Sequence, residues 1–324
     1  MCGIAGIIYR NGLRPDNGLH PSNGAGPPNR IGRDMTSMLQ SMKHRGPDST
    51  GYALYHAPSQ ELTVRVNLAE STVPRDMDFA DDVARRRRDV QARLRAAGAQ
   101  IKSTEDANDY TFSATVAYDG DLKTLADQIE SVPHAEVLSL GHSLEIVKDL
   151  GDARTVSDAY ELDGYLGSHG IGHVRMATES DVDIANAHPY WAYPFSDVAV
   201  VHNGQLTNYH QWRRRLEASG HRFASECDSE IIAVYLANRM ADGESLEDAM
   251  HHSLEDLDGV FTYICVSEDA LGMAKDELAA KPLVLYEGED MVALASEEMA
   301  IRAVIDHEIE TYDPYESAVM VWTR

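Results

Sequence analysis

A cysteine stands at position 2 of the chain, directly after the initiator methionine. Because the side chain of Cys2 is small, we expect removal of Met1, which would leave one residue holding both a thiol and a free α-amine. An α-amine has a pKa of about 7.7–8.0, so it can accept the thiol proton near neutral pH and later deliver it to a leaving group. These two groups predict a nucleophile. The alternative is a small residue in a buried first strand, and a retained Met1 would abolish the proposed base.

Other side chains with binding or catalytic chemistry gather in short segments near glycines and strand ends. In chain order these segments are Arg45-Gly46-Pro47-Asp48-Ser49-Thr50-Gly51, Gly172-His173-Val174-Arg175-Met176-Ala177-Thr178, Asn186-Ala187-His188-Pro189, His202-Asn203-Gly204-Gln205-Leu206-Thr207-Asn208 and Cys227-Asp228-Ser229-Glu230. Each segment alone is weak evidence, and an Asn-Gly pair by itself is more typical of a hairpin turn. Their order along the chain, beginning at position 2, makes the combined signal strong.

This ordered set resembles the class II glutamine amidotransferases, which are N-terminal-nucleophile hydrolases. The resemblance covers residues 2–51 and about 172–300. It implies that the chain hydrolyses the side-chain amide of glutamine, releasing glutamate and ammonia, and that the ammonia passes to a synthase site. It also implies an α+β fold, a four-layer αββα sandwich with Cys2 at the end of a central strand.

The resemblance also assigns roles to individual residues. The Cys2 thiolate would attack the amide carbon, while the side-chain amide of Asn203 and the backbone N–H of Gly204 would stabilise the oxyanion of the tetrahedral intermediate. Arg175 would bind the α-carboxylate of glutamine through its guanidinium group, and Asp228 would bind the α-ammonium.

Thr178 and His188 also fall on positions that line the substrate pocket in this family. Two alternatives stay open at this point. His188 could be a structural histidine before a turn proline, and Asp228 could cap a helix as well as bind substrate. Arg45 and Asp48 are more typical of residues that anchor a loop than of catalysts.

Three positions depart from the family pattern without removing a proposed functional group. Met176 stands where an aromatic residue is common, Glu179 where one branch has a histidine, and Cys227 in place of a frequent serine. The larger departure is length, because 120 residues separate Gly51 from Gly172.

Hydrophobic spacing predicts the elements that must position these residues. The run 2–9 predicts a buried strand, and apolar residues at helical spacing predict a helix that ends near Lys43. The part of the chain beyond residue 165 alternates short apolar strands with two helices, one over about 208–218 and one beginning at Asp228 as its N-cap. Because strands outnumber helices and no βαβ alternation persists, the pattern favours a layered α+β sandwich.

The stretch from about 68 to 165 differs in character. Two charged or amphipathic helices, near 79–94 and 122–129, alternate with strands near 111–118 and 136–147, and no chemical motif accompanies them. We therefore predict one amidotransferase domain over residues 2–324, interrupted by an α+β insertion at about 68–165.

Composition narrows the class of protein. Acidic residues number 53 and basic residues 28, which gives a formal net charge of −25. This charge argues against nucleic acid or an anionic membrane as a partner, because either would need a basic face. No apolar stretch is long enough to span a membrane and no signal peptide is evident, so we expect a cytoplasmic protein. No metal-ligand spacing or glycine-rich phosphate loop is present, so we expect no cofactor and no metal in this chain.

The chain ends soon after the family pattern ends, so we expect the ammonia acceptor on another chain. Its size and expanded middle resemble the stand-alone glutamate-synthase-type amidotransferase subunit of N-methylglutamate synthase (methylamine–glutamate N-methyltransferase). That resemblance implies glutamate-synthase-like partner subunits in a hetero-oligomer, with FMN, and as a further candidate an iron–sulfur cluster, on those partners. The alternatives are an amidotransferase-fold subunit with a structural or regulatory role and vestigial activity, or a hydrolase of a different amide.

Overall fold

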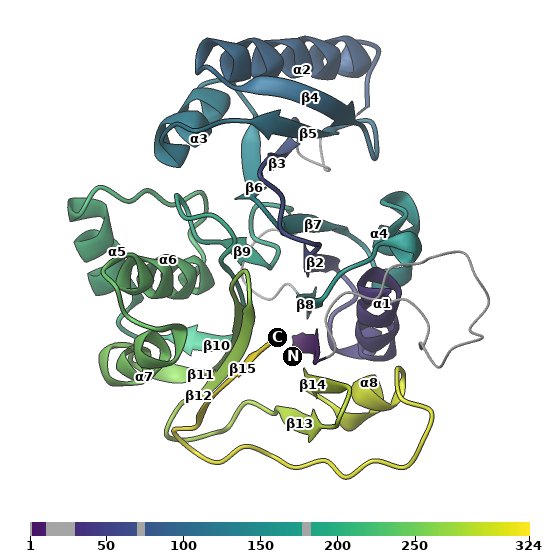
Figure 1. Ribbon diagram of the computed structural model, residues 1–324, viewed down its shortest axis with the longest axis vertical. Helices are drawn as coiled ribbons and strands as arrows, with labels where there is room; N and C mark the ends of the chain where they lie inside the picture. Colours follow the sequence, from purple (N-terminus) through teal and green to yellow (C-terminus); the bar gives the residue numbers. More distant parts are fainter. Residues whose placement is uncertain (1, 11–29, 70–74, 177–182) are drawn as a thin grey trace.

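The computed structural model describes residues 2–10, 30–69, 75–176 and 183–324 of the chain. Within this part, the strands form a six-stranded, a five-stranded and a four-stranded sheet. The first two sheets face each other, and the four-stranded sheet belongs to a separate lobe at the top of Figure 1.

The six-stranded sheet holds the predicted first strand near its centre. Its strands, in spatial order, are β13 (Val284–Glu287), β14 (Met291–Ala295), β1 (Gly3–Tyr9), β8 (His169–Arg175), β2 (Ser49–Tyr55) and β7 (Leu144–Leu150). Neighbouring strands are antiparallel throughout. All residues of β1 are buried, as expected for a short apolar run covered on both faces. Cys2 directly precedes this central strand, which confirms the predicted placement.

The five-stranded sheet carries the second group of motifs. Its strands, in spatial order, are β15 (Val319–Thr323), β12 (Ala270–Lys275), β11 (Gly259–Val266), β10 (Ala199–Leu206) and β9 (Tyr190–Trp191). These neighbours are antiparallel as well. The Asn203-Gly204 pair lies within β10, opposite Thr262 and Phe261 of β11, so the hairpin-turn alternative for this pair is wrong.

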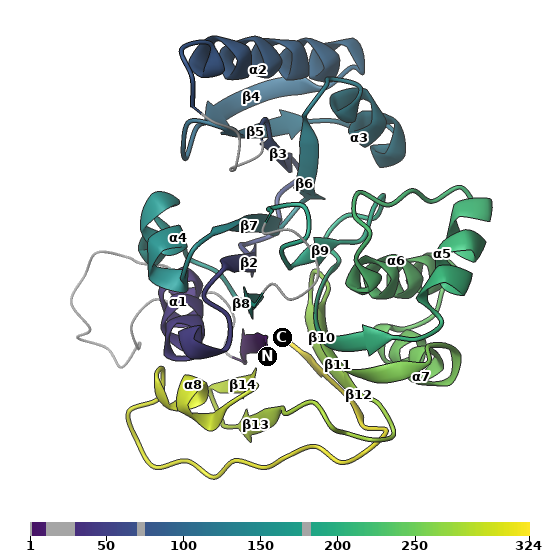
Figure 2. The same ribbon diagram turned by 180° about the vertical axis from the view of Figure 1, so that it is seen from behind.

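Helices cover the outer faces of both sheets (Figures 1 and 2). Against the six-stranded sheet lie α1 (Ile31–Ser41), α4 (Ala153–Ala159) and α8 (Glu298–Arg302), and against the five-stranded sheet lie α6 (Asp228–Ala241) and α7 (Leu246–Asp256), with α5 (Tyr209–Ala218) packed on α6. Short 3₁₀ turns occupy Lys43–Arg45 and Leu162–Gly164. The order helix, sheet, sheet, helix confirms the predicted four-layer αββα sandwich.

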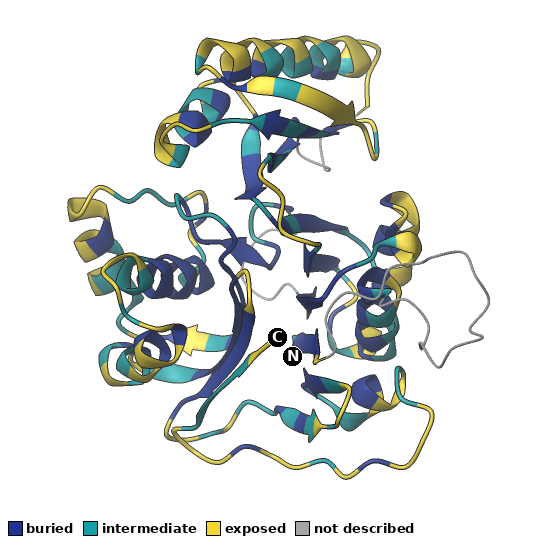
Figure 3. Cartoon of the chain, in the orientation of Figure 1, coloured by how far each residue is buried: buried dark blue, intermediate teal, exposed yellow. Residues whose placement is uncertain are grey.

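Figure 3 shows that the strands of the two facing sheets are largely buried. Because side chains alternate along each strand, the core is divided between these layers. Ile4 of β1 packs between the two sheets together with Val201 of β10. The next residue, Ala5, points the other way and packs with Leu39 of α1. On the five-stranded sheet, residues that point outward pack against α6 and α7. None of the described helices has the length and apolar character needed to cross a membrane.

The lobe comprises residues 62–141, and its described part has its own sheet and its own helical cover. The strands, in spatial order, are β4 (Gln100–Glu105), β5 (Thr111–Ala117), β3 (Leu62–Asn67) and β6 (Glu136–Gly141), and the helices are α2 (Phe79–Ala96) and α3 (Leu122–Glu130). The helices lie on one face of this sheet, where Val83, Val90 and Leu94 of α2 are buried.

The bounds of the lobe differ from the insertion predicted at about 68–165. β3 starts the lobe sheet before residue 68, because Leu62–Asn67 pairs with β5 and β6. At the other end, β7 pairs with β2 in the six-stranded sheet and α4 packs against α1, so both belong to the sandwich. The strand β4 was not predicted, since most of its residues are exposed and it lacks an apolar alternation.

Candidate active site

Cys2 lies at the point where the two sheets of the sandwich approach each other, and two distant segments hold its backbone. Its carbonyl oxygen accepts a hydrogen bond from Nε of Arg45 at 3.0 Å and another from Nδ2 of Asn203 at 3.2 Å. The side chain is half-buried, and its Sγ lies 3.9 Å from the carbonyl oxygen of Met176. The thiol is therefore fixed in position while remaining partly accessible.

The register of β1 and β8 brings Arg175 to the same place. Gly3 pairs with Val174, so one further step along the ladder places Cys2 opposite Arg175. Cys2 is two residues before Ile4, whose side chain points between the sheets, so alternation directs the Cys2 side chain to the same inner face. Arg175 ends β8 and is 8% exposed. Thr178, predicted to line the pocket, lies outside the described residues.

Arg45 connects this end of β1 to the segment after β14. Its Nη1 donates to Oε1 of Glu297 at 2.7 Å, while the adjacent Ser296 accepts the backbone N–H of Ile4 through Oγ at 3.0 Å. Gly46 follows, and a Cβ there would lie 2.5 Å from the carbonyl carbon of Arg175. These contacts agree with the interpretation of Arg45 as an anchoring residue, and they define its target as the Cys2 backbone.

Asn203 and Gly204 approach Cys2 from the facing sheet. Asn203 is buried, and the hydrogen bond from its Nδ2 to the Cys2 carbonyl uses one of its two amide hydrogens. Gly204 has φ +150°, and a Cβ on it would lie 2.2 Å from the carbonyl oxygen of Val260. Only glycine fits this backbone position. The strand thus presents a side-chain amide to the Cys2 carbonyl and requires a glycine immediately after it.

Asp228 is the first residue of α6, whose N-cap is Cys227, so the prediction of Asp228 as the N-cap was wrong. Its Oδ2 accepts the backbone N–H of Leu206 at 2.7 Å, which ties the start of α6 to the end of β10. Its Oδ1 lies 3.7 Å from Nδ1 of His202. A carboxylate in the first turn also interacts favourably with the helix dipole. The side chain remains 20% exposed, so one carboxylate can serve both the fold and a bound cation.

His188 belongs to a buried cluster of imidazoles behind this turn. Its ring packs edge-on against His173, with centroids 4.1 Å apart, and its Nε2 lies 3.8 Å from Sγ of Cys227. Burial lowers the pKa of His188 well below its ordinary value, and the nearby His173, His202 and Arg175 add to the effect. Burial likewise lowers the pKa of His173 to about 3. These rings are therefore neutral at physiological pH.

The neutral cluster bears on which group could activate the thiol. Within the described residues, Sγ of Cys2 makes no hydrogen bond to a histidine, and no group of three or more His, Cys, Asp or Glu side chains is placed to hold a metal ion. His188 contacts the Cys227–Asp228 turn rather than Cys2. The assignment of His188 to the lining of the substrate pocket stays a prediction.

The structure thus brings most of the predicted residues to one place. Cys2 and Asn203 are joined by a hydrogen bond, Arg175 joins them through the strand register, and Asp228 is linked to β10 near Gly204. The sequence-based predictions gave no role to His173 or His202. The histidines stand within the quoted motifs, but nothing in their spacing indicated that they would pack together.

Comparisons with known proteins agree on one family. The family described as "Glutamine amidotransferase domain" matches residues 173–303. A Methanothermobacter thermautotrophicus protein, named as a glutamine amidotransferase, is 37% identical over 321 residues, which cover 98% of this chain and 99% of that protein. The glutamine amidotransferase-like protein GlxB of Rhizobium meliloti is 33% identical over 288 residues, covering 89% of this chain and 86% of that protein.

Solved structures share the fold. The glutamine phosphoribosylpyrophosphate amidotransferase from B. subtilis, in complex with ADP and GMP, aligns over 99% of this chain with a TM-score of 0.59 and 18% identity. A structure described as the allosteric regulatory enzyme of purine biosynthesis aligns equally far with a TM-score of 0.60. In both cases the chain spans about half, 47%, of the longer protein.

Proposed function

This chain belongs to the class II glutamine amidotransferases, and we propose that it is the glutaminase chain of a multi-subunit, glutamate-synthase-like complex, with Cys2 as its nucleophile. The observation that carries the catalytic part is the junction at Cys2. Arg45, from the 3₁₀ turn Lys43–Arg45, and Asn203, from β10 of the facing sheet, both donate to its carbonyl oxygen, which places Cys2 next to the Asn203-Gly204 pair.

The proposed reaction begins once Met1 has been removed. The α-amine of Cys2 takes the thiol proton, and the thiolate attacks the side-chain amide carbon of glutamine to form a tetrahedral intermediate. The remaining N–H of the Asn203 amide and the N–H of Gly204 stabilise the oxyanion. The intermediate collapses when the protonated amine donates to the leaving nitrogen, which departs as ammonia. Water then hydrolyses the thioester, giving glutamate and restoring the thiol.

Substrate selection rests on two opposite charges at the rim of this junction. The guanidinium of Arg175 can bind the α-carboxylate with two parallel hydrogen bonds, and the partly exposed carboxylate of Asp228 can bind the α-ammonium. Both residues are held by the fold, Arg175 by its place at the end of β8 and Asp228 by its hydrogen bond to Leu206. The site therefore suits a free α-amino acid that carries a side-chain amide.

Substitution of Arg175 by alanine is expected to raise the KM for glutamine about 10- to 100-fold, because charge-assisted hydrogen bonds contribute about 1.5–3 kcal/mol. The kcat should change much less, since the guanidinium binds a part of the substrate that does not react. Initial rates of glutamate release over a range of glutamine concentrations measure both constants. Arg302→Ala, which removes an exposed arginine paired with Glu298 on α8, is the control. An unchanged KM in Arg175→Ala would rule out the assigned role.

The proposed complex is of the N-methylglutamate synthase type, with FMN, and as a further candidate an iron–sulfur cluster, on the partner chains. Its support is the resemblance of the whole chain, lobe included, to stand-alone amidotransferase subunits. The match to the Methanothermobacter relative includes the lobe, since it covers 98% of this chain.

Co-purification of the native protein tests the complex. We expect glutamate-synthase-like partners, a flavin spectrum in the complex, and glutamine-dependent turnover that responds to added methylamine. The isolated chain should release glutamate without responding to methylamine. Recovery of the chain without such partners would count against the complex, while leaving the glutaminase assignment to be decided by glutamate release.

A further inference from the structure

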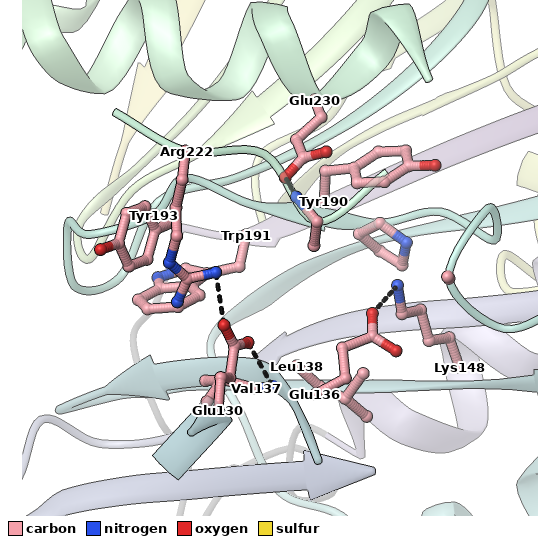
Figure 4. Close-up of a pocket in the computed structure, with 13 residues that line it drawn as sticks. Glu130, Glu136, Val137, Leu138, Lys148, Tyr190, Trp191, Tyr193, Arg222 and Glu230 are labelled. Carbon is pink, nitrogen blue, oxygen red and sulfur yellow. Dashed lines mark hydrogen bonds and ion pairs between the residues drawn. The ribbon is translucent and has the colours of Figure 1, made fainter. Parts of the chain in front are cut away.

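Arg222 joins the lobe to the sandwich. It lies on the loop between α5 and α6, and its Nε donates to Oδ1 of Asp127 at 2.8 Å while its Nη1 pairs with Glu130. Both carboxylates belong to α3 of the lobe. The guanidinium carbon lies 3.9 Å from the centroid of the Tyr193 ring, and the Tyr193 hydroxyl donates to the same Oδ1 of Asp127 at 2.6 Å. Figure 4 shows Arg222 between the Tyr193 ring and Glu130.

A pocket lies beside this junction, and charged pairs cross it. Among its lining residues, Glu136 of β6 faces Lys148 of β7, with Oε1 and Nζ 3.5 Å apart. Lys148 is only 5% exposed. The acidic partners Asp127, Glu130 and Glu136 all come from the lobe, and the basic partners come from the sandwich (Figure 4). Ion pairs between acidic residues of the lobe and basic residues of the sandwich therefore hold the two parts together.

The loop that carries Arg222 runs directly into the proposed substrate site. Glu230 of α6 accepts the backbone N–H groups of Ala224 and Ser225 at 2.8 and 2.9 Å and the Ser225 hydroxyl at 2.7 Å. Ser225 Oγ in turn accepts the backbone N–H of Cys227 at 3.1 Å. Asp228 is the next residue. A hydrogen-bonded turn thus connects the Arg222 side of the loop to the carboxylate proposed to bind the α-ammonium of glutamine.

We infer that Arg222 is a positioning residue, through which the docked lobe holds the Cys227–Asp228 turn in the geometry that binds glutamine. The inference rests on the proposed glutaminase function for its kinetic consequence. Its structural part stands on the contacts alone. Without the Arg222 contacts the turn keeps its hydrogen bonds to Glu230 and to Leu206 of β10 but loses the support of the lobe, so its position can shift. A displacement of about 1 Å at a binding group is enough to alter affinity strongly.

The chain offers a matched control in Arg239. Arg239 also pairs with two carboxylates, Glu244 and Asp256, and its guanidinium carbon lies 5.0 Å from the centroid of the Tyr235 ring. Its side chain is 26% exposed, against 34% for Arg222. It lies at the far end of α6 from Asp228. Arg222→Gln and Arg239→Gln therefore remove similar interactions, but only the first should affect glutamine binding.

The expected result for Arg222→Gln is a rise of about tenfold in the KM for glutamine with kcat changed less than about twofold. Arg239→Gln should lower the Tm by about as much as Arg222→Gln does, but it should leave the KM unchanged. Arg222→Lys should recover part of the affinity, because it keeps the charge. Glu130→Gln should raise the KM as well, and combining it with Arg222→Gln should add little, because the two residues act through one contact. Equal KM values in all variants overturn the inference.

Hydrogen exchange gives a second readout that needs no activity. In Arg222→Gln the amides of Ala224, Ser225 and Cys227 should exchange faster than in the unsubstituted chain, whereas in Arg239→Gln they should not. Unchanged exchange at these three amides also overturns the inference. If the unsubstituted chain released no glutamate, the proposed function would fail, and the exchange result would still decide the role of Arg222.

Discussion

Replacement of Cys2 by alanine is expected to lower the rate of glutamate release from glutamine about 10⁴-fold or more, because it removes the attacking sulfur and leaves only binding and oxyanion stabilisation. Replacement by serine should also cause a large loss, since a hydroxyl is a much weaker nucleophile near neutral pH. The fold should tolerate either change, because the contacts that hold this residue are made by its backbone carbonyl.

The measurement is glutamate release by the purified chain, together with its intact mass. Cys265→Ala is the control, because Cys265 is a buried thiol in β11. A glutamine-like electrophile should label the unsubstituted chain once, at Cys2, and the active protein should lack the mass of Met1. Full activity in Cys2→Ala, or in a chain that retains Met1, would refute the mechanism and favour a structural or regulatory role.

The surroundings of Cys2 bear on the identity of its base. Burial holds the pKa of His173 and His188 far below neutrality, so neither imidazole changes charge near pH 7–8. In the described part of the chain, no histidine is hydrogen-bonded to Sγ. The α-amine of a processed Cys2, with a pKa of about 7.7–8.0, is the remaining group attached to the nucleophile that can exchange a proton in this range.

Local pattern was sufficient to predict the central strands. The runs that became β1, β8 and β10 are short and apolar, and such runs can be buried on both faces of a sandwich. These three runs also contain or adjoin the motifs. The order of the motifs along the chain therefore indicated where the site lies. Strand register is different, because it depends on contacts between segments that are far apart in sequence. The hydrogen bond from Arg45 to the Cys2 carbonyl spans 43 positions and leaves no periodic signal.

The errors have physical reasons as well. The strand β4 was not predicted because most of its residues are exposed. An exposed strand needs no regular alternation of apolar and polar residues, so its sequence carries no strand pattern. The end of the lobe was placed too late because β7 follows β6 after a short turn, and only pairing with β2 assigns β7 to the sandwich. Asp228 was expected as a cap from its residue type. The structure instead uses its carboxylate to hold the Leu206 amide, a role that no helix pattern specifies.

Replacement of Asn203 by alanine is expected to lower kcat about 10²–10³-fold with little change in the KM for glutamine, because an oxyanion donor acts mainly in the transition state. Asn203→Asp should be at least as damaging, since an ionised carboxylate accepts hydrogen bonds and cannot donate one. Asn208→Ala provides a matched control. Its side-chain amide also donates to a backbone carbonyl, that of Asp256 at 2.9 Å, but at the outer end of β10.

A rate constant alone would not separate the proposed oxyanion role of Asn203 from a positioning role, because the same amide also donates to the Cys2 carbonyl. Alkylation of Cys2 by iodoacetamide separates them, since that displacement forms no oxyanion but still needs a correctly placed thiol. A large loss of kcat with an unchanged alkylation rate assigns the residue to oxyanion stabilisation. A parallel loss of both rates would instead make Asn203 a positioning residue for Cys2, and Arg45, the other donor to that carbonyl, would then be expected to give the same result when substituted.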